Sequence, residues 1–260
     1  MKKMFASVLF AVTALIGTNA IAQEPSRKPI IVLVHGAFAD ASSWNGVVEI
    51  LQKDGYFVVA AANPLRGVKS DGAQIASLVG DLNAPVVLVG HSYGGNVITE
   101  AANGRSNVKA LVYVGAFAPD SGETVAELAG KFPGGTLGPA LAPPVELADG
   151  SKDLYVLQSK FHAQFAADVP AAKAALMAAT QRPIAAAALN EKTGDAAWKN
   201  IPSWFIYGDA DKNIPPAAMA FMAKRALAKD VVVVKGASHA VMVSHANAVA
   251  RLIEKAASAK

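Results

Sequence analysis

The sequence predicts an α/β fold with a mainly parallel sheet flanked by helices. Short apolar runs rich in β-branched residues alternate along the chain with amphipathic stretches, which is typical of βαβ units. One such run ends in a Gly-x-Ser-x-Gly sequence that leads into a helical stretch, and parallel sheets gather their functional groups at such strand ends. The chain has 260 residues, a length that suits one domain of the larger α/β kind.

The first residues have the pattern of a secretory signal peptide. The basic segment Met1–Lys3 precedes an apolar run over Met4–Ile16 and a small-residue end at Ala22. The run is shorter than the about 20 apolar residues that span a bilayer. We therefore expect a signal peptide over residues 1–22, a mature domain over 23–260, and a periplasmic or secreted protein with no membrane anchor after cleavage.

The charge balance and the cysteine content indicate which kinds of partner and covalent link to expect. Lys and Arg total 24 against 20 acidic residues, and removing Lys2 and Lys3 with the signal peptide leaves 22 against 20, a net charge of +2. No basic block or stripe interrupts the chain, so we expect no nucleic-acid partner. There is no cysteine, which excludes disulfides and lipid attachment at a cysteine.

Six strands and several helices follow from the pattern in chain order. The predicted strands are Ile30–Val34, Phe57–Ala61, Val86–Val89, Ala110–Val114, Trp204–Tyr207 and Val231–Val234. The predicted helices are Ser43–Lys53, Asp71–Leu82, a helix beginning near Asn96, Pro216–Ala228 and His245–Ala257. Asp71 is a candidate N-cap of the second helix.

One stretch breaks this alternation. Between Val114 and Trp204 the sequence has no clear strand; it begins with turns rich in Gly and Pro and continues with Ala-rich segments of helical character. A structureless loop of this length is uncommon in a compact domain. We expect a helical lid inserted over about residues 120–200, before the strand that carries the acid, covering the strand ends. The alternative is a surface insertion without a role in the site.

The segment from Gly90 to Gly95 reads Gly-His-Ser-Tyr-Gly-Gly and lies between a buried strand and a helix. This is the pattern of a nucleophile elbow, in which a strained turn exposes the hydroxyl, here that of Ser92. Gly90 and Gly94 would allow the strand and the helix to approach closely. The sequence therefore predicts Ser92 as a nucleophile.

The first strand ends in His35-Gly-Ala-Phe38, and a turn there would aim the Ala37 N–H at the site. The N–H of Tyr93, the residue after the nucleophile, would be the second donor of an oxyanion hole. We expect His35 and His91 to be structural, packed or hydrogen-bonded beneath these turns.

Two late strands end next to an acid and a base. One is followed by Asp209 and Asp211, the other by His239, which gives the chain order Ser, Asp, His of a nucleophilic triad. Imidazole accepts the serine proton at neutral pH, and a carboxylate holds the imidazole in the required tautomer. Spacing alone does not decide whether Asp209 or Asp211 is the acid of the triad. Asp120 is a more distant candidate for this acid, or alternatively a turn residue.

These motifs together resemble the α/β-hydrolase superfamily, in particular the small esterase and hydroxynitrile-lyase-like branch that includes plant methyl esterases. The motifs are HGAF at 35–38, GHSYGG at 90–95, YGDADKNIP at 207–215 and GASHAVMVSH at 236–245. The resemblance implies the α/β-hydrolase fold. Its Gly-x-x-Asp-x-x-x-Pro pattern, matched by Gly208, Asp211 and Pro215, implies that Asp211 is the acid and that Asp209 caps a loop.

The expected activity is that of a serine carboxylesterase on small apolar esters, through Ser92, His239 and Asp211. Nothing has the spacing of a zinc site or of a dinucleotide-binding loop, so we expect no metal and no cofactor. The alternatives are a hydroxynitrile lyase, a cofactor-free perhydrolase and a non-catalytic ligand-binding relative. The resemblance implies a lysine after the catalytic histidine and a hydroxyl residue in the first turn for a lyase; Ala240 and Ala37 stand there instead. A haloalkane dehalogenase would need Asp in place of Ser92.

The insertion also holds apolar side chains that are candidates for the pocket wall, with packing as the alternative. They are Phe161, Phe165, Leu176, Met177 and Trp198. His162 in the insertion and His245 near a helix start are expected to be solvated or packed, with His162 a lesser candidate for the pocket.

Overall fold

The computed structural model describes residues 28–259. The predicted signal peptide lies outside these residues. No helix in the described part of the chain is long and apolar enough to cross a membrane.

A six-stranded parallel sheet forms the centre of the molecule, in the order β2-β1-β3-β4-β8-β9. The strands are β1 (Ile30–Val34), β2 (Val58–Ala61), β3 (Val86–His91), β4 (Val108–Val114), β8 (Ser203–Gly208) and β9 (Asp230–Val234). Each corresponds to a predicted strand, within two residues at either end. The six were predictable because parallel strands are runs rich in apolar, β-branched residues. The central strand β3 is buried along its whole length, whereas the edge strand β9 leaves Val231 and Val233 exposed.

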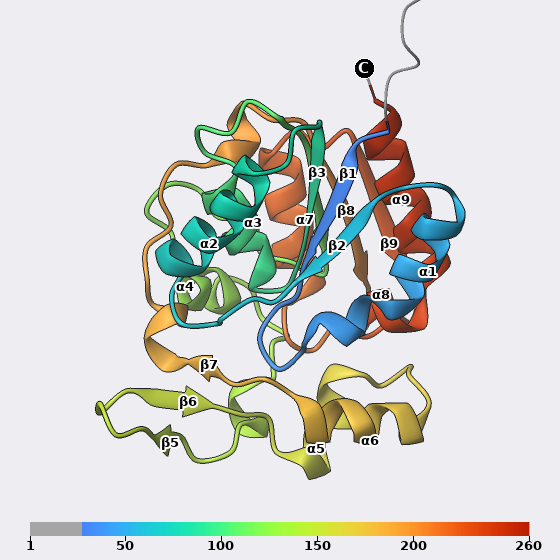
Figure 1. The fold of residues 1–260 in the computed structure, drawn as a ribbon. Coiled ribbons are helices and arrows are strands. Elements are labelled where there is room, and N and C mark those ends of the chain that lie inside the picture. The colour runs from blue at the N-terminus through green and yellow to red at the C-terminus, as the bar shows by residue number, and fades with distance from the viewer. Residues whose placement is uncertain (1–27, 260) are drawn as a thin grey trace, which may run out of the picture.

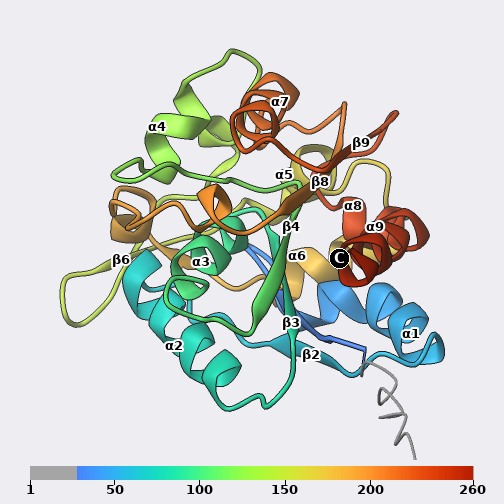
Figure 2. The ribbon, with the colours of Figure 1, turned by 90° about the horizontal axis from the view of Figure 1, so that it is seen from above.

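Helices cover both faces of this sheet (Figure 1). The helices α1 (Asn45–Lys53), α8 (Val241–Ser244) and α9 (Ala246–Ser258) pack on one face. On the other face lie α2 (Val68–Gly80), α3 (Gly94–Ala101) and α7 (Pro216–Arg225). Figure 2 shows the two groups on opposite sides of the twisted sheet. The α/β-hydrolase fold with a mainly parallel, helix-flanked sheet is confirmed.

The start of α2 differs from its prediction. Gly67 is the N-cap residue, and Asp71 lies in the first turn, where its carboxylate accepts hydrogen bonds from the Arg66 N–H. The prediction of Asp71 as the N-cap was therefore wrong: the helix begins one turn earlier, and the Asp71 carboxylate binds the backbone that leads into it.

The insertion between β4 and β8 is mixed rather than purely helical. Its helical segments are α4 (Val125–Gly130), α5 (Gln158–Phe165), α6 (Ala171–Thr180) and the 3₁₀ turns η2 (Gly138–Ala140), η3 (Ala186–Leu189) and η4 (Ala197–Lys199). A small antiparallel sheet joins β5 (Val145–Glu146), β6 (Lys152–Leu154) and β7 (Ile184–Ala185). Strands of two or three residues are too short for an alternating pattern, so the sequence did not reveal them.

Figure 1 shows the small sheet with α5 and α6 as a layer below one end of the main sheet. Several contacts hold this layer to loops of the main domain, and three of them involve the loops that follow β1 and β2. The Ala185 N–H donates to the Leu65 carbonyl at 2.9 Å, and the Phe38 N–H donates to the Arg182 carbonyl at 3.0 Å. Arg66 Nη1 donates to Asp153 Oδ1 at 2.6 Å. The insertion therefore lies against the loops that follow β1 and β2.

Candidate active site

Ser92 lies on the turn between β3 and α3, as the elbow pattern predicts. Its φ is +54°, a left-handed conformation that is costly for a residue with a side chain and is characteristic of functional turns. A Cβ on Gly90 would lie 2.4 Å from the Gly94 carbonyl oxygen, so only glycine permits this turn. The turn brings the Ser92 hydroxyl to the wall of a cavity.

The turn after β1 lies directly against this elbow. A Cβ on Gly36 would lie 2.6 Å from the Ser92 Cβ and 3.2 Å from the Tyr93 nitrogen. Within residues 28–259, the N–H groups of Ala37 and Tyr93 donate to no protein acceptor, and both residues line the same cavity as Ser92. Two unpaired backbone donors therefore lie beside the serine, the arrangement that stabilises an oxyanion.

Asp211 and His239 form a buried hydrogen-bonded pair. Asp211 Oδ2 lies 2.7 Å from His239 Nδ1, and each side chain is 1% exposed. The other carboxylate oxygen accepts from the N–H of Asn213 at 2.8 Å and of Ile214 at 3.0 Å. With Nδ1 donating to the carboxylate, Nε2 is the nitrogen left to accept a proton.

The two other carboxylates considered for the acid, Asp209 and Asp120, bind other groups. Asp209 Oδ1 accepts from the Gly236 N–H at 2.6 Å and so ties two loops together. Asp120 pairs with Lys199, and the hydrogen bond from this ammonium group lowers the pKa of Asp120. Of the three carboxylates, in the described chain, only Asp211 contacts His239.

Aromatic rings hold His239 beside the elbow. Its ring centroid lies 4.9 Å from that of Phe165 in an edge-on contact and 4.7 Å from that of His91, the residue before Ser92. Among the described residues Ser92 Oγ makes no hydrogen bond with His239. Such bonds are often long without substrate and tighten in the reacting complex.

His35 and His91 are buried beneath the two turns. His35 Nε2 accepts from the Asn63 N–H at 3.0 Å, and its Nδ1 donates to the Gly36 carbonyl at 3.0 Å. His91 Nε2 donates to the His239 carbonyl at 3.1 Å. Burial lowers the pKa of His35 and, more strongly, that of His91. Both rings are therefore neutral and bonded to the backbone that shapes the site.

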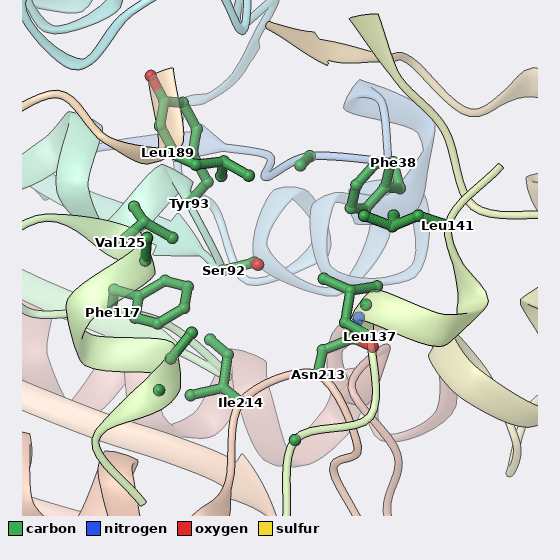
Figure 3. Close-up of a pocket in the computed structure, with 16 residues that line it drawn as sticks. Phe38, Ser92, Tyr93, Phe117, Val125, Leu137, Leu141, Leu189, Asn213 and Ile214 are labelled. Carbon is green, nitrogen blue, oxygen red and sulfur yellow. The ribbon is translucent and has the colours of Figure 1, made fainter. Parts of the chain in front are cut away.

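The cavity beside Ser92 has a volume of about 340 Å³ and mainly apolar walls. Besides the elbow and the first turn, its larger side chains are Phe117, Val125, Leu137, Leu141, Leu189 and Ile214. Figure 3 shows these side chains arranged around the Ser92 hydroxyl. Most of them belong to the insertion, which therefore forms one side of the cavity.

None of the five side chains proposed from sequence as pocket wall lines this cavity in the described structure. Phe161 and Phe165 are fully buried and stack on each other. Trp198 is packed, and its indole N–H donates to the Pro119 carbonyl at 2.7 Å. Leu176 and Met177 line a different cavity. The packing alternative was correct for the three aromatic residues.

The remaining histidines, His162 and His245, do not line the cavity beside Ser92. His162 Nε2 donates to the Val169 carbonyl at 2.8 Å, and His245 lies 3.5 Å from the Asp168 carboxylate. Within the described chain, no three acidic or imidazole side chains gather as metal ligands.

Sequence reasoning also missed a buried polar contact behind the elbow. The Tyr93 hydroxyl donates to Asp71 Oδ2 at 2.9 Å, and Asp71 is fully buried. Burial raises the pKa of the Asp71 carboxyl, and burial next to this carboxyl raises the pKa of the Tyr93 hydroxyl. The only sequence signal was an acidic residue on an otherwise apolar face of the helix.

The fold, the elbow and the buried acid–base pair define a hydrolase of the α/β class. The chain belongs to the alpha/beta hydrolase family, whose model matches residues 31–252. It is similar to an alpha/beta hydrolase from Aspergillus novofumigatus, with 27% identity over 88% of this chain and 97% of the relative. It is also similar to an alpha-hydroxynitrile lyase from Arabidopsis thaliana, with 26% identity over 84% of this chain and 93% of the relative.

Among solved structures, polyneuridine aldehyde esterase superposes with a TM-score of 0.76 at 17% identity, covering 88% of this chain and 99% of that chain. At this identity the likeness establishes the shared fold.

Proposed function

We propose that this protein is a serine esterase that cleaves small apolar carboxylic esters. The observation that carries the proposal is the buried hydrogen bond between Asp211 and His239 next to an elbow serine that lines the cavity. A base whose Nε2 is free to accept a proton converts a weakly nucleophilic hydroxyl into an effective nucleophile.

In the first half of the proposed reaction, Ser92 Oγ attacks the ester carbonyl carbon and its proton passes to His239 Nε2. The carbonyl oxygen becomes an oxyanion that accepts hydrogen bonds from the Ala37 and Tyr93 N–H groups. Collapse of this intermediate breaks the bond to the alcohol oxygen, which takes the proton from Nε2 and leaves as the alcohol. Asp211 stabilises the imidazolium throughout.

In the second half, a water molecule attacks the acyl-serine carbon and gives one proton to His239 Nε2. The same two backbone donors hold the new oxyanion. When the intermediate collapses, Ser92 Oγ takes back the proton and the carboxylic acid is released. Every proton that leaves an oxygen is received by His239, so the cycle needs no metal or redox cofactor.

The substrate class follows from the cavity. Its walls expose mostly carbon atoms, and its volume of about 340 Å³ lies at the lower end of the range for small-molecule sites. Apart from the Ser92 hydroxyl and the two backbone N–H donors, the side chains that line the cavity offer few hydrogen-bond partners. An ester with a small apolar chain on either side of the carbonyl fits this lining.

The hydroxynitrile-lyase alternative has one observation in its favour, the similarity to the Arabidopsis lyase. Cyanide departure needs a positive group near the leaving anion. Here the residue after His239 is Ala240, which is fully buried and apolar. We therefore place ester hydrolysis first.

We also propose that the protein is exported to the periplasm or secreted, with cleavage after Ala22. The support is the basic start, the short apolar run and the small-residue end of residues 1–22. Expression of the full chain in a bacterial host, followed by mass measurement of the product, tests this. A product that begins at Gln23 is expected in the periplasmic fraction; an uncleaved chain in the cytoplasm would contradict the proposal.

The esterase proposal is tested with the purified protein and nitrophenyl acetate or butyrate. Wild type should show turnover, and Ser92→Ala should lose it while keeping the same thermal unfolding transition. A fluorophosphonate probe should label Ser92 alone. Equal turnover in the two proteins would refute the mechanism, and mandelonitrile cleavage without ester turnover would favour the lyase.

A further inference from the structure

A second cavity, of about 320 Å³, lies between the turn after β1 and helix α6. The atoms exposed on its wall are mainly apolar, and its apolar residues are Phe38, Ala39, Leu176, Met177 and Val243. The rest of its wall is polar and consists of Asp40, Ser42, Ser43, Asn45, Lys173, Thr180 and Gln181. Nothing in the proposed mechanism uses this space. Its walls come from both the main domain and the insertion, as do those of the substrate cavity.

Phe38 lines both cavities and is the one residue of the described chain that their walls share. In Figure 3 its ring lies beside Leu141, on the side of Ser92 away from Phe117 and Val125. It therefore closes one end of the substrate cavity, and the second cavity begins behind it.

The backbone holds this ring in place. Phe38 has φ +59°, which is uncommon for an aromatic residue, and its N–H donates to the Arg182 carbonyl of the insertion at 3.0 Å. The side chain is 4% exposed. Strained residues of this kind cluster at active sites and ligand-binding turns, and Phe38 directly follows the oxyanion-hole candidate Ala37.

We propose that the Phe38 ring determines chain-length specificity by separating the substrate cavity from an adjoining alkyl-binding cavity, so that the enzyme accepts only short aliphatic ester chains. This inference rests on the proposed esterase function and names the substrate class of the same site. Without the ring, the two cavities would join into a space of about twice the volume, apolar along the shared wall.

The size of the effect follows from alkyl burial. Each methylene group moved from water into an apolar site contributes a factor of about four in binding. An octanoyl chain has four more methylenes than a butyryl chain. If two of these become buried in the second cavity, the ratio of kcat/KM for octanoyl over butyryl esters rises by about 15-fold.

The test compares nitrophenyl butyrate with octanoate, and butyl with octyl acetate, on wild type and Phe38→Ala. The matched control is Leu141→Ala, which widens the substrate cavity at the same end without opening the second one. A double variant, Phe38→Ala with Met177→Trp, refills the second cavity. Phe38→Leu serves if the alanine variant does not fold, because it removes the ring with a smaller loss of packing.

The inference is supported if Phe38→Ala raises the long-to-short ratio of kcat/KM by about tenfold or more in either ester series. Leu141→Ala should show no such rise, and adding Met177→Trp to Phe38→Ala should reverse it. An unchanged ratio in Phe38→Ala or Phe38→Leu, with butyrate turnover retained, overturns the inference.

Binding of octanoate and 1-octanol, measured by calorimetry, separates the inference from the proposed function because it needs no turnover. Tighter binding of either ligand to Phe38→Ala than to wild type supports the proposal that the Phe38 ring separates the two cavities, even if no ester is hydrolysed. Equal binding of both ligands by the two proteins counts against it.

Discussion

The two aspartates after β8 are close in the chain, and their contacts differ enough for one pair of variants to separate their roles. Asn has nearly the same shape as Asp, so Asp211→Asn keeps an oxygen to accept from the Asn213 and Ile214 N–H groups, which now lie at 2.8 and 3.0 Å. Its NH₂ group would then face His239 Nδ1, which lies 2.7 Å from the replaced oxygen.

A donor at that position forces Nδ1 to accept, which moves the imidazole proton to Nε2. His239 can then no longer remove the proton from Ser92. Loss of the correct tautomer in a serine triad costs about 10⁴ in kcat, equivalent to about 5 kcal/mol at 1.36 kcal/mol per tenfold. Because the loop hydrogen bonds are kept, we expect the free energy of unfolding to change by no more than about 1 kcal/mol.

Asp209→Asn is the matched control. Its retained oxygen still accepts from the Gly236 N–H, which lies at 2.6 Å in the native loop, and no part of it contacts His239. We expect less than about a twofold change in kcat, since exposed substitutions that keep their contacts have small effects. The assay is steady-state hydrolysis of nitrophenyl butyrate, with urea unfolding of both variants.

Two results would refute the reasoning. One is Asp211→Asn retaining a tenth or more of the wild-type kcat. The other is that Asp209→Asn loses as much kcat as Asp211→Asn while remaining folded. That result would contradict the assignment of Asp211, and not Asp209, as the acid.

Three further predictions concern stability. Gly90→Ala places a Cβ against the backbone of the following helix and should lower the free energy of unfolding by about 2–3 kcal/mol in urea titrations. Burial lowers the pKa values of His35 and His91. The unfolded chain binds their protons first, so the free energy of unfolding should decrease as the pH falls below 6.5, with a limiting slope of about 1.4 kcal/mol per pH unit for each ring. Tyr93→Phe removes the hydroxyl donor from the buried Asp71 carboxylate and should cost about 1–3 kcal/mol.

Each of these has its own check. Gly130→Ala, whose Cβ would meet nothing within 4 Å, should keep the wild-type stability; equal losses at both glycines would contradict the steric argument. His91→Gln should flatten the pH dependence between pH 6.5 and 5.5, and an unchanged slope would exclude a contribution from this ring. A double-mutant cycle of Tyr93→Phe with Asp71→Asn should give a coupling of about 0.5–3 kcal/mol, whereas additive losses would mean that the two groups act independently.

The central sheet was predictable because its information is local. Each of the six strands is a contiguous run rich in apolar, β-branched residues, the pattern of parallel strands, and this holds even for the edge strand β9, where Val231 and Val233 are exposed. The small sheet of β5, β6 and β7 was not, because its strands of two or three residues pair through backbone groups and carry no side-chain period. The same holds for the turns of the insertion that supply Leu137 and Leu141 to the cavity wall.

The sequence by itself determined the fold class, the strand-turn-helix around Ser92, and a short set of acids and bases at the right strand ends. These follow from contiguous patterns. Only the tertiary structure decided that Asp211, rather than Asp209, meets His239, and that Phe38 separates two cavities. Asp211 and His239 are 28 residues apart in the chain, and which side chains meet at that distance depends on how β8, β9 and their loops pack. No local pattern records that packing, so it had to be observed.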